Sequence, residues 1–281
     1  MSEIDVKTAL NVHLGIVRTG SSSIRRLIRD YCEISGEVCS HFPETDQEQK
    51  SDDAKYILME CPYPYHKQVE RPCRYFTTLR DPVDSVISEY YFYLERNEID
   101  KDVTLDDYIS ALPASYNKQA RWMAAINSPD ETRHLTTQPR NMFECGFYDT
   151  IDDSDLLEEV KESAAKYFAV IGLLERLEET AFLFATQMGW STVPILKRMN
   201  PSIRTSIVKK TPPTVLQVQK IKACNRADEI LYHSVVQNFN QQVQGIMQTY
   251  GSQFATYQEQ CQVVDRAFLE KQEELVEKHK A

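Results

Sequence analysis

One segment near the N-terminus constrains the fold more than any other, because an apolar run leads through a short Gly/Ser loop directly into an amphipathic helix. The run covers residues 10–16 and the loop covers residues 17–23. Apolar side chains then recur at the i, i+3, i+4, i+7 spacing of one helix face, at Ile24, Leu27, Ile28 and Tyr31. The segment predicts a strand over 10–16 and a helix over 22–33. Such a loop presents backbone N–H groups and hydroxyls at a helix N-terminus, which is how proteins hold phosphate or sulfate groups.

A second segment repeats this strand-to-helix arrangement. Residues 75–79 bear no charge and predict a buried strand, so Arg80 is the first charged side chain at its end. Asp81 is a good N-cap, and Pro82 suits the first helical position because the missing N–H leaves no intrahelical bond unmade. Ligands of α/β proteins bind beyond the carboxyl ends of strands, so the position of Arg80 favours binding over an ion pair with Asp81 or Asp84.

The rest of the chain alternates short strands and helices, which is typical of an α/β fold with a mostly parallel sheet. Strands are predicted at 38–42, 56–59 and 168–171, and helices at 116–125 and from Glu178 to about Gly189. The polar stretch 43–54 and the acidic stretch 97–107 predict loops.

From Gln237 onward the sequence predicts a helical extension. Proline is absent, glutamine is abundant, and apolar residues recur in steps of three and four, at Phe239, Val243, Ile246, Tyr250, Phe254, Tyr257, Cys261, Val264 and Phe268. We therefore divide the chain into a domain at 1–236 and an extension at 237–281, with a break near Gly251. The extension either packs on its own domain, which we favour, or pairs with a second copy as a coiled-coil homodimer.

The composition of the chain excludes or disfavours several classes of protein. The chain has 281 residues, 42% of them hydrophobic and 26% charged, and it contains neither a membrane-length apolar run nor a signal-peptide core. Seven cysteines without a CxxC pair indicate reduced thiols and a cytoplasmic setting. The net charge of −10 disfavours nucleic acid as a partner. No His, Cys and Asp cluster has the spacing of metal ligands.

Together the two segments resemble the cofactor-binding motifs of sulfotransferases that use 3′-phosphoadenosine 5′-phosphosulfate (PAPS). In that superfamily a Lys/Arg-[TS]-G-[STG]-[ST] loop after the first strand binds the 5′-phosphosulfate, and a later Arg and Ser bind the 3′-phosphate. The loop here is Arg18-Thr19-Gly20-Ser21-Ser22-Ser23, and Arg80 with Ser88 has the spacing of the second pair.

The resemblance covers roughly residues 10–232 and is closest to heparan-type 2-O-sulfotransferases and their bacterial relatives. It implies a P-loop-like three-layer fold around a mostly parallel sheet, with a helical C-terminal extension. It also implies that Arg18, Thr19, Gly20, Ser21, Ser22 and Ser23 bind the phosphosulfate and that Arg80 and Ser88 bind the 3′-phosphate, without a metal. Asn117, Gln119 and Arg121 match the family pattern within the acceptor or nucleotide cleft.

Transfer of a sulfonate to a hydroxyl requires a general base. Where the related 2-O-sulfotransferases have a Gly-His pair, this chain has Met59-Glu60, so Glu60 replaces the family histidine as the expected base. A carboxylate can do this if burial raises its pKa. His66 matches a second family histidine and is the alternative base. For both residues the alternative remains that the side chain only forms a structural hydrogen bond or is exposed. Arg18 is expected to neutralise charge on the leaving phosphate, where many family members have Lys.

A basic run late in the chain contains Lys197, Arg198, Arg204, Lys209 and Lys210. Family members close a late basic loop over the nucleotide, so one of these residues is expected to touch PAPS, unless the run is only a solvated surface.

The resemblance therefore implies a PAPS-dependent sulfotransferase that moves a sulfonate group to a hydroxyl or amine of a small metabolite, natural product or saccharide. Three alternatives stay open: a non-catalytic nucleotide-binding relative, a nucleotide-dependent kinase, and an interaction protein built around the C-terminal helix. The kinase is disfavoured because the G-x-x-x-x-G-K-[ST] motif is absent.

Overall fold

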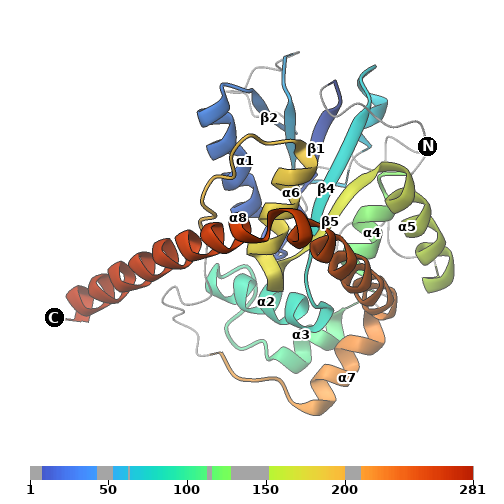
Figure 1. The fold of residues 1–281 in the computed structure, drawn as a ribbon. Coiled ribbons are helices and arrows are strands. Elements are labelled where there is room, and N and C mark those ends of the chain that lie inside the picture. The colour runs from blue at the N-terminus through green and yellow to red at the C-terminus, as the bar shows by residue number, and fades with distance from the viewer. Residues whose placement is uncertain are drawn as a thin grey trace.

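The computed structural model describes residues 8–42, 53–62, 64–112, 116–127, 152–199 and 210–280. Within these ranges one parallel sheet has the strand order β2-β3-β1-β4-β5 (Figure 1). Its strands are β1 (Leu10–Leu14), β2 (Cys39–Phe42), β3 (Tyr56–Met59), β4 (Cys73–Leu79) and β5 (Phe168–Leu173). The central strand β1 pairs with β3 on one side and with β4 on the other. The predicted α/β class with a parallel sheet is confirmed.

Helices cover both faces of the sheet. On one face lie α1 (Ser21–Ser35) and α6 (Leu177–Met188), where Phe184 of α6 packs edge-on against Phe76 of β4. Successive side chains of a strand point to opposite faces, so Tyr75 marks the other face. There its ring packs against Tyr167, at the end of α5 (Asp153–Tyr167). The short helix α4 (Lys118–Ala124) contacts α5 on this second face.

A smaller apolar cluster lies beyond the carboxyl ends of the strands. It is formed by α2 (Pro82–Glu95), α3 (Leu105–Ala111) and α7 (Val215–Cys224), which lie together in the lower part of Figure 1. The prediction of a loop over 97–107 is wrong for its last residues. Thr104 and Asp107 form a capping box there, and α3 begins at Leu105. A second capping box, formed by Thr214 and Gln217, starts α7, a helix that was not predicted from the sequence.

The long C-terminal helix α8 (Arg226–Lys280) is confirmed, with a kink at Tyr250, next to Gly251. Eight of its apolar residues are buried in the same core as the strands: Leu231, Val235, Phe239, Val243, Ile246, Phe254, Tyr257 and Cys261. The helix therefore packs on its own chain over most of its length. It begins at Arg226, so the predicted boundary between 236 and 237 falls inside it. Its C-terminal part extends beyond the rest of the fold (Figure 1).

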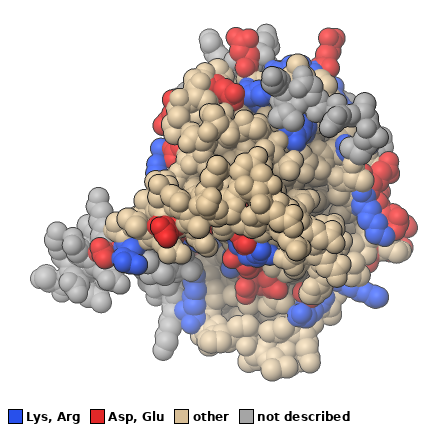
Figure 2. Space-filling model, in the orientation of Figure 1, with Lys and Arg blue, Asp and Glu red and all other residues tan. Residues whose placement is uncertain are grey.

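Charge is spread over the surface rather than gathered on one side of the face shown in Figure 2, where Lys and Arg alternate with Asp and Glu around a largely uncharged middle. Cys32, Cys61, Cys73, Cys224 and Cys261 form no disulfide bond. Within the described ranges, none of the helices combines the length and apolar character needed to cross a bilayer.

Candidate functional site

The Gly/Ser loop forms a tight turn at the carboxyl end of β1. Arg18 has a φ of 68° and Gly20 a φ of 86°, both in the left-handed region. Gly20 is the N-cap of α1, and its φ is one that residues with a Cβ rarely adopt, so a larger residue would be strained there. A Cβ would also lie 2.6 Å from Cδ1 of Leu174, which would have to move. Gly20, the N-cap residue, has no side chain with which to cap the helix. The first N–H groups of a helix, at the positive end of its dipole, are where proteins bind anions.

The loop hydroxyls have different partners. The Thr19 side chain is buried and donates to the carbonyl of Ile16, which closes the turn. Ser22 Oγ accepts from the Arg25 guanidinium, and Ser23 Oγ accepts from the backbone N–H of Met199. Thr19 and Ser23 thus stabilise the loop itself, whereas Ser21 and Ser22 begin α1 at the turn.

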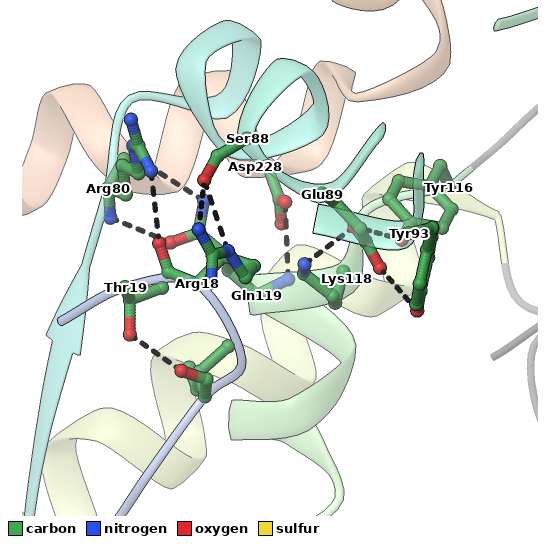
Figure 3. A network of polar contacts seen from close by, with 11 residues as sticks. Arg18, Thr19, Arg80, Ser88, Glu89, Tyr93, Tyr116, Lys118, Gln119 and Asp228 are labelled. Atoms are coloured by element: carbon green, nitrogen blue, oxygen red, sulfur yellow. Dashed lines mark hydrogen bonds and ion pairs between the residues drawn. The ribbon is translucent and has the colours of Figure 1, made fainter. Parts of the chain in front are cut away.

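The structure brings Arg18 and Ser88 into direct contact, although 70 residues separate them in sequence (Figure 3). Nε and Nη2 of Arg18 donate to Ser88 Oγ over 3.1 and 3.0 Å. The same guanidinium lies over the ring of Phe92, 4.6 Å from its centroid. Ser88 and Phe92 are four residues apart on α2 and so share one helix face. The guanidinium therefore points toward the residue assigned to the 3′-phosphate.

Arg80 joins this cluster at the carboxyl end of β4. Its Nη1 donates to the backbone carbonyl of Arg18 over 3.4 Å. Within the described part of the chain, neither Arg18 nor Arg80 forms an ion pair with a carboxylate. Burial lowers the pKa of both guanidinium groups, and the charge of Arg80 lowers that of Arg18 further. The carboxylates of Asp81, Asp84 and Glu175 act on Arg80 only from a distance, as a smaller effect than burial. Two neighbouring cations that form no ion pair among the described residues are suited to binding an anion.

A buried polar network supports the α2 side of this cluster. Glu89, next to Ser88, is 1% exposed and forms an ion pair with Lys118 at 2.8 Å. Its carboxylate also accepts from the hydroxyls of Tyr93 and Tyr116, at 3.2 and 2.8 Å. Burial, and then the charge of Glu89, raise the pKa of both tyrosines, so both stay protonated donors. Local sequence patterns do not predict this network, because a mid-helix Glu has no local signal of burial.

The two candidate bases lie in different places. Glu60 follows β3 at the carboxyl edge of the sheet, forms an ion pair with Arg25, and has a side chain 57% exposed. The burial expected to raise its pKa is not found. His66 hydrogen bonds to Tyr75, near the start of β4, and stacks on Tyr167, just before β5. Its ring therefore lies toward the amino edge of the sheet, away from Arg80, and burial lowers its pKa to about 4.

The basic run does not gather at the cluster in the residues described. Lys197 forms an ion pair with Asp30, and Arg198 forms ion pairs with Glu178 and Asp265. The Lys210 ammonium lies 5.7 Å from the ring centroid of Tyr91 on α2. Arg204 and Lys209 lie outside the described residues.

The described ranges contain no group of three or more His, Cys, Asp or Glu side chains arranged to hold a metal ion. A scan against protein-family models gives no match, and a search of curated proteins finds no relative.

Proposed function

We propose that the chain is a sulfotransferase that uses PAPS as donor and transfers the sulfonate to a hydroxyl or amine of a small metabolite, natural product or saccharide. The observation that supports this most directly is the cluster of Arg18, Arg80 and Ser88. All three belong to the two motifs that resemble the superfamily, and two of them are neighbouring cations that form no ion pair with a carboxylate in the described part of the chain. A polyanionic nucleotide would neutralise them.

The sheet topology supports a ligand at the same place. From β1 the chain passes through α1 to β2, on one side, and later returns past β1 to β4 on the other. The connections after β1 and β4 therefore run in opposite directions, so the position between these two strands is a topological switch point. Open α/β sheets bind ligands at such points, beyond the carboxyl ends of their strands. Arg18 follows β1 and Arg80 follows β4. A P-loop-like fold, with the nucleotide phosphates at the start of α1, agrees with this arrangement.

Each group has a chemical task in this proposal. The uncapped N–H groups at the start of α1 and the Ser21 and Ser22 hydroxyls bind the 5′-phosphosulfate. Arg80 and Ser88 bind the 3′-phosphate, and Arg18 supplies positive charge that stabilises the leaving phosphate. Glu60 is the proposed base for the acceptor, because it lies at the carboxyl edge of the sheet, whereas His66 does not.

A second candidate function is nucleotide binding without transfer. It is favoured by the exposure of Glu60 and its ion pair with Arg25, since a cationic partner lowers the basicity of a carboxylate.

The binding step is tested with adenosine 3′,5′-bisphosphate, the desulfated product, against ATP, which lacks a 3′-phosphate. We expect the bisphosphate to raise the melting temperature and ATP to raise it much less, because a ligand stabilises the state that it binds. Arg80→Ala should abolish most of this difference. Equal shifts with both nucleotides in the unmodified protein would overturn the assignment.

The transfer step is tested with radiolabelled PAPS and a panel of hydroxyl and amine acceptors. Binding without labelled product would favour the second candidate. If product forms, Arg18→Ala should lower turnover on the order of 10²-fold, the effect of removing one transition-state donor. Arg18→Lys should retain substantial activity because a cation remains.

A further inference from the structure

The backbone of Arg80 is held by one side chain from another helix. Arg80 lies between the end of β4 at Leu79 and the N-cap of α2 at Asp81, where neither element provides a partner for its peptide groups. Gln119 provides both. Its Oε1 accepts from the N–H of Arg80 over 2.8 Å, and its Nε2 donates to the carbonyl of Arg80 over 2.9 Å (Figure 3). The amide thus fixes the peptide groups on both sides of the Arg80 Cα.

Gln119 is itself held rigidly. Its side chain is 1% exposed, and its backbone N–H donates to the carboxylate of Asp228 over 3.1 Å. The next N–H, of Ala120, donates to the other oxygen of Asp228 over 2.7 Å. Asp228 lies in the first turn of α8. The C-terminal helix therefore fixes the start of α4, and α4 in turn fixes the backbone of Arg80.

We propose that Gln119 is a positioning residue that sets the direction of the Arg80 guanidinium and thereby the recognition of a ribose 3′-phosphate. The inference rests on the proposed function, because it takes Arg80 to be a phosphate ligand. Arginine reaches its ligand through a long side chain, so a small rotation of its backbone displaces the guanidinium by a large fraction of a hydrogen-bond length. A bidentate contact with phosphate tolerates little of this displacement.

The test measures the affinities of the full chain for adenosine 3′,5′-bisphosphate and for adenosine 5′-monophosphate by calorimetry. Their ratio isolates the contribution of the 3′-phosphate. In Gln119→Met, which keeps the side-chain length but removes both hydrogen bonds, we expect the ratio to fall about 10- to 100-fold, with the monophosphate affinity little changed. Gln119→Glu is a second variant that keeps the acceptor for the N–H but replaces the donor with a carboxylate oxygen that faces the Arg80 carbonyl. We expect the ratio to fall in this variant too.

A matched control separates positioning from general destabilisation. Trp190→Phe removes the indole hydrogen bond to Tyr56, at the start of β3, and should lower stability without changing the ratio. A further comparison uses Arg80→Ala, in which adding Gln119→Met should change the ratio no further.

The outcomes distinguish the two proposals. If the unmodified protein does not prefer the bisphosphate, the proposed function fails and this inference fails with it. If it does prefer the bisphosphate, and folded Gln119→Met or Gln119→Glu keeps the full ratio, then the proposed function stands and the positioning part assigned to Gln119 is wrong. A lower ratio in the Gln119 variants that is equalled by Trp190→Phe would also overturn the inference.

Discussion

Asn117 and Asp228 each cap the helix to which the other belongs. The Asn117 side-chain oxygen accepts from the backbone N–H groups of Ala227 and Asp228 at the start of α8, over 2.9 and 3.2 Å. The Asp228 carboxylate accepts from the first N–H groups of α4, as described above. Asn117 has a φ of 38°, in the left-handed region that Asn tolerates better than most residues. Both residues are buried, so water cannot replace either cap.

Because Asp228 caps α4, we predict that substitutions of Asp228 lower the free energy of unfolding, and that the loss grows with the number of hydrogen bonds removed. Asp228→Ala leaves two buried N–H groups without an acceptor, at a cost of about 1–3 kcal/mol for each. Asp228→Asn keeps one carbonyl oxygen as acceptor and should cost less. Urea unfolding monitored by circular dichroism gives the free energies of unfolding. If Asp228→Asn is as unstable as Asp228→Ala, the lost stability comes from the charge and not from the caps.

We predict that the chain needs α8 up to Cys261 in order to fold, and that it folds without the part of α8 beyond the packed residues. Deletion from residue 237 removes Phe239, Val243, Phe254 and Tyr257, which are buried in the core, and exposes the apolar side chains on which they pack, such as Phe182 of α6. We expect that protein to aggregate.

A chain that ends after Arg266 keeps the residues of α8 that are buried among those whose burial is described, the last of which is Cys261, and also Asp265, which pairs with Arg198. It should fold with nearly the melting temperature of the full chain. Light scattering on both proteins also tests the coiled-coil alternative. A dimer of the full chain that becomes a monomer on this short deletion would place the self-association in the projecting end of α8.

Stability is predicted to fall as the pH drops below about 6.5, in part through His13. This residue lies within β1, is 1% exposed, and neither of its ring nitrogens has a hydrogen-bond partner among the residues that the structure describes. Burial, followed by the charge of Arg25, lowers its pKa to about 3. Between the ordinary histidine pKa and this value the unfolded chain binds a proton that the folded chain does not. The free energy of unfolding should therefore fall by roughly 1.4 kcal/mol per pH unit from this group.

The measurement compares the unmodified protein with His13→Leu over pH 5.0–7.5 in urea. Asp228 acts in the opposite direction, because burial raises its pKa to about 6 and the folded state then binds the extra proton. Both proteins contain Asp228, so its contribution cancels in the comparison. The leucine variant should have the shallower loss of stability toward low pH. Parallel curves would mean that His13 binds a proton in the folded protein at the same pH as in the unfolded chain.

Local sequence patterns predicted the parts of the site that follow a strand. Arg18 and Arg80 could be found because each follows an apolar run and precedes a helix start, and parallel strands bring their carboxyl ends to one edge. Ser88 followed from spacing alone. Gln119 and Asp228 were beyond such reasoning as parts of a clamp, because their partners lie 39 and 109 residues away in sequence. The starts of α3 and α7 had a local signal, the capping boxes at Thr104 and Thr214, which the acidic and polar composition of these stretches concealed.

The placement of the bases shows the same limit. A resemblance in sequence aligned both Glu60 and His66 with family histidines, yet only tertiary structure separates the two edges of the sheet. Tyr75 and Tyr167 hold the His66 ring at the start of β4, whereas Glu60 follows the end of β3.

The last prediction concerns the acceptor proton. Glu60→Gln should lower turnover by roughly 10²–10⁴-fold, the contribution of a general base, while the affinity for adenosine 3′,5′-bisphosphate stays unchanged. His66→Phe is the matched control, since it keeps an aromatic ring beside Tyr167, and it should retain turnover. If His66→Phe is inactive and Glu60→Gln is active, the base is His66, and the sheet edge at which the acceptor binds must be reassigned. If both variants are active, the acceptor needs no base from either residue, as expected for an amine that is already neutral at the working pH.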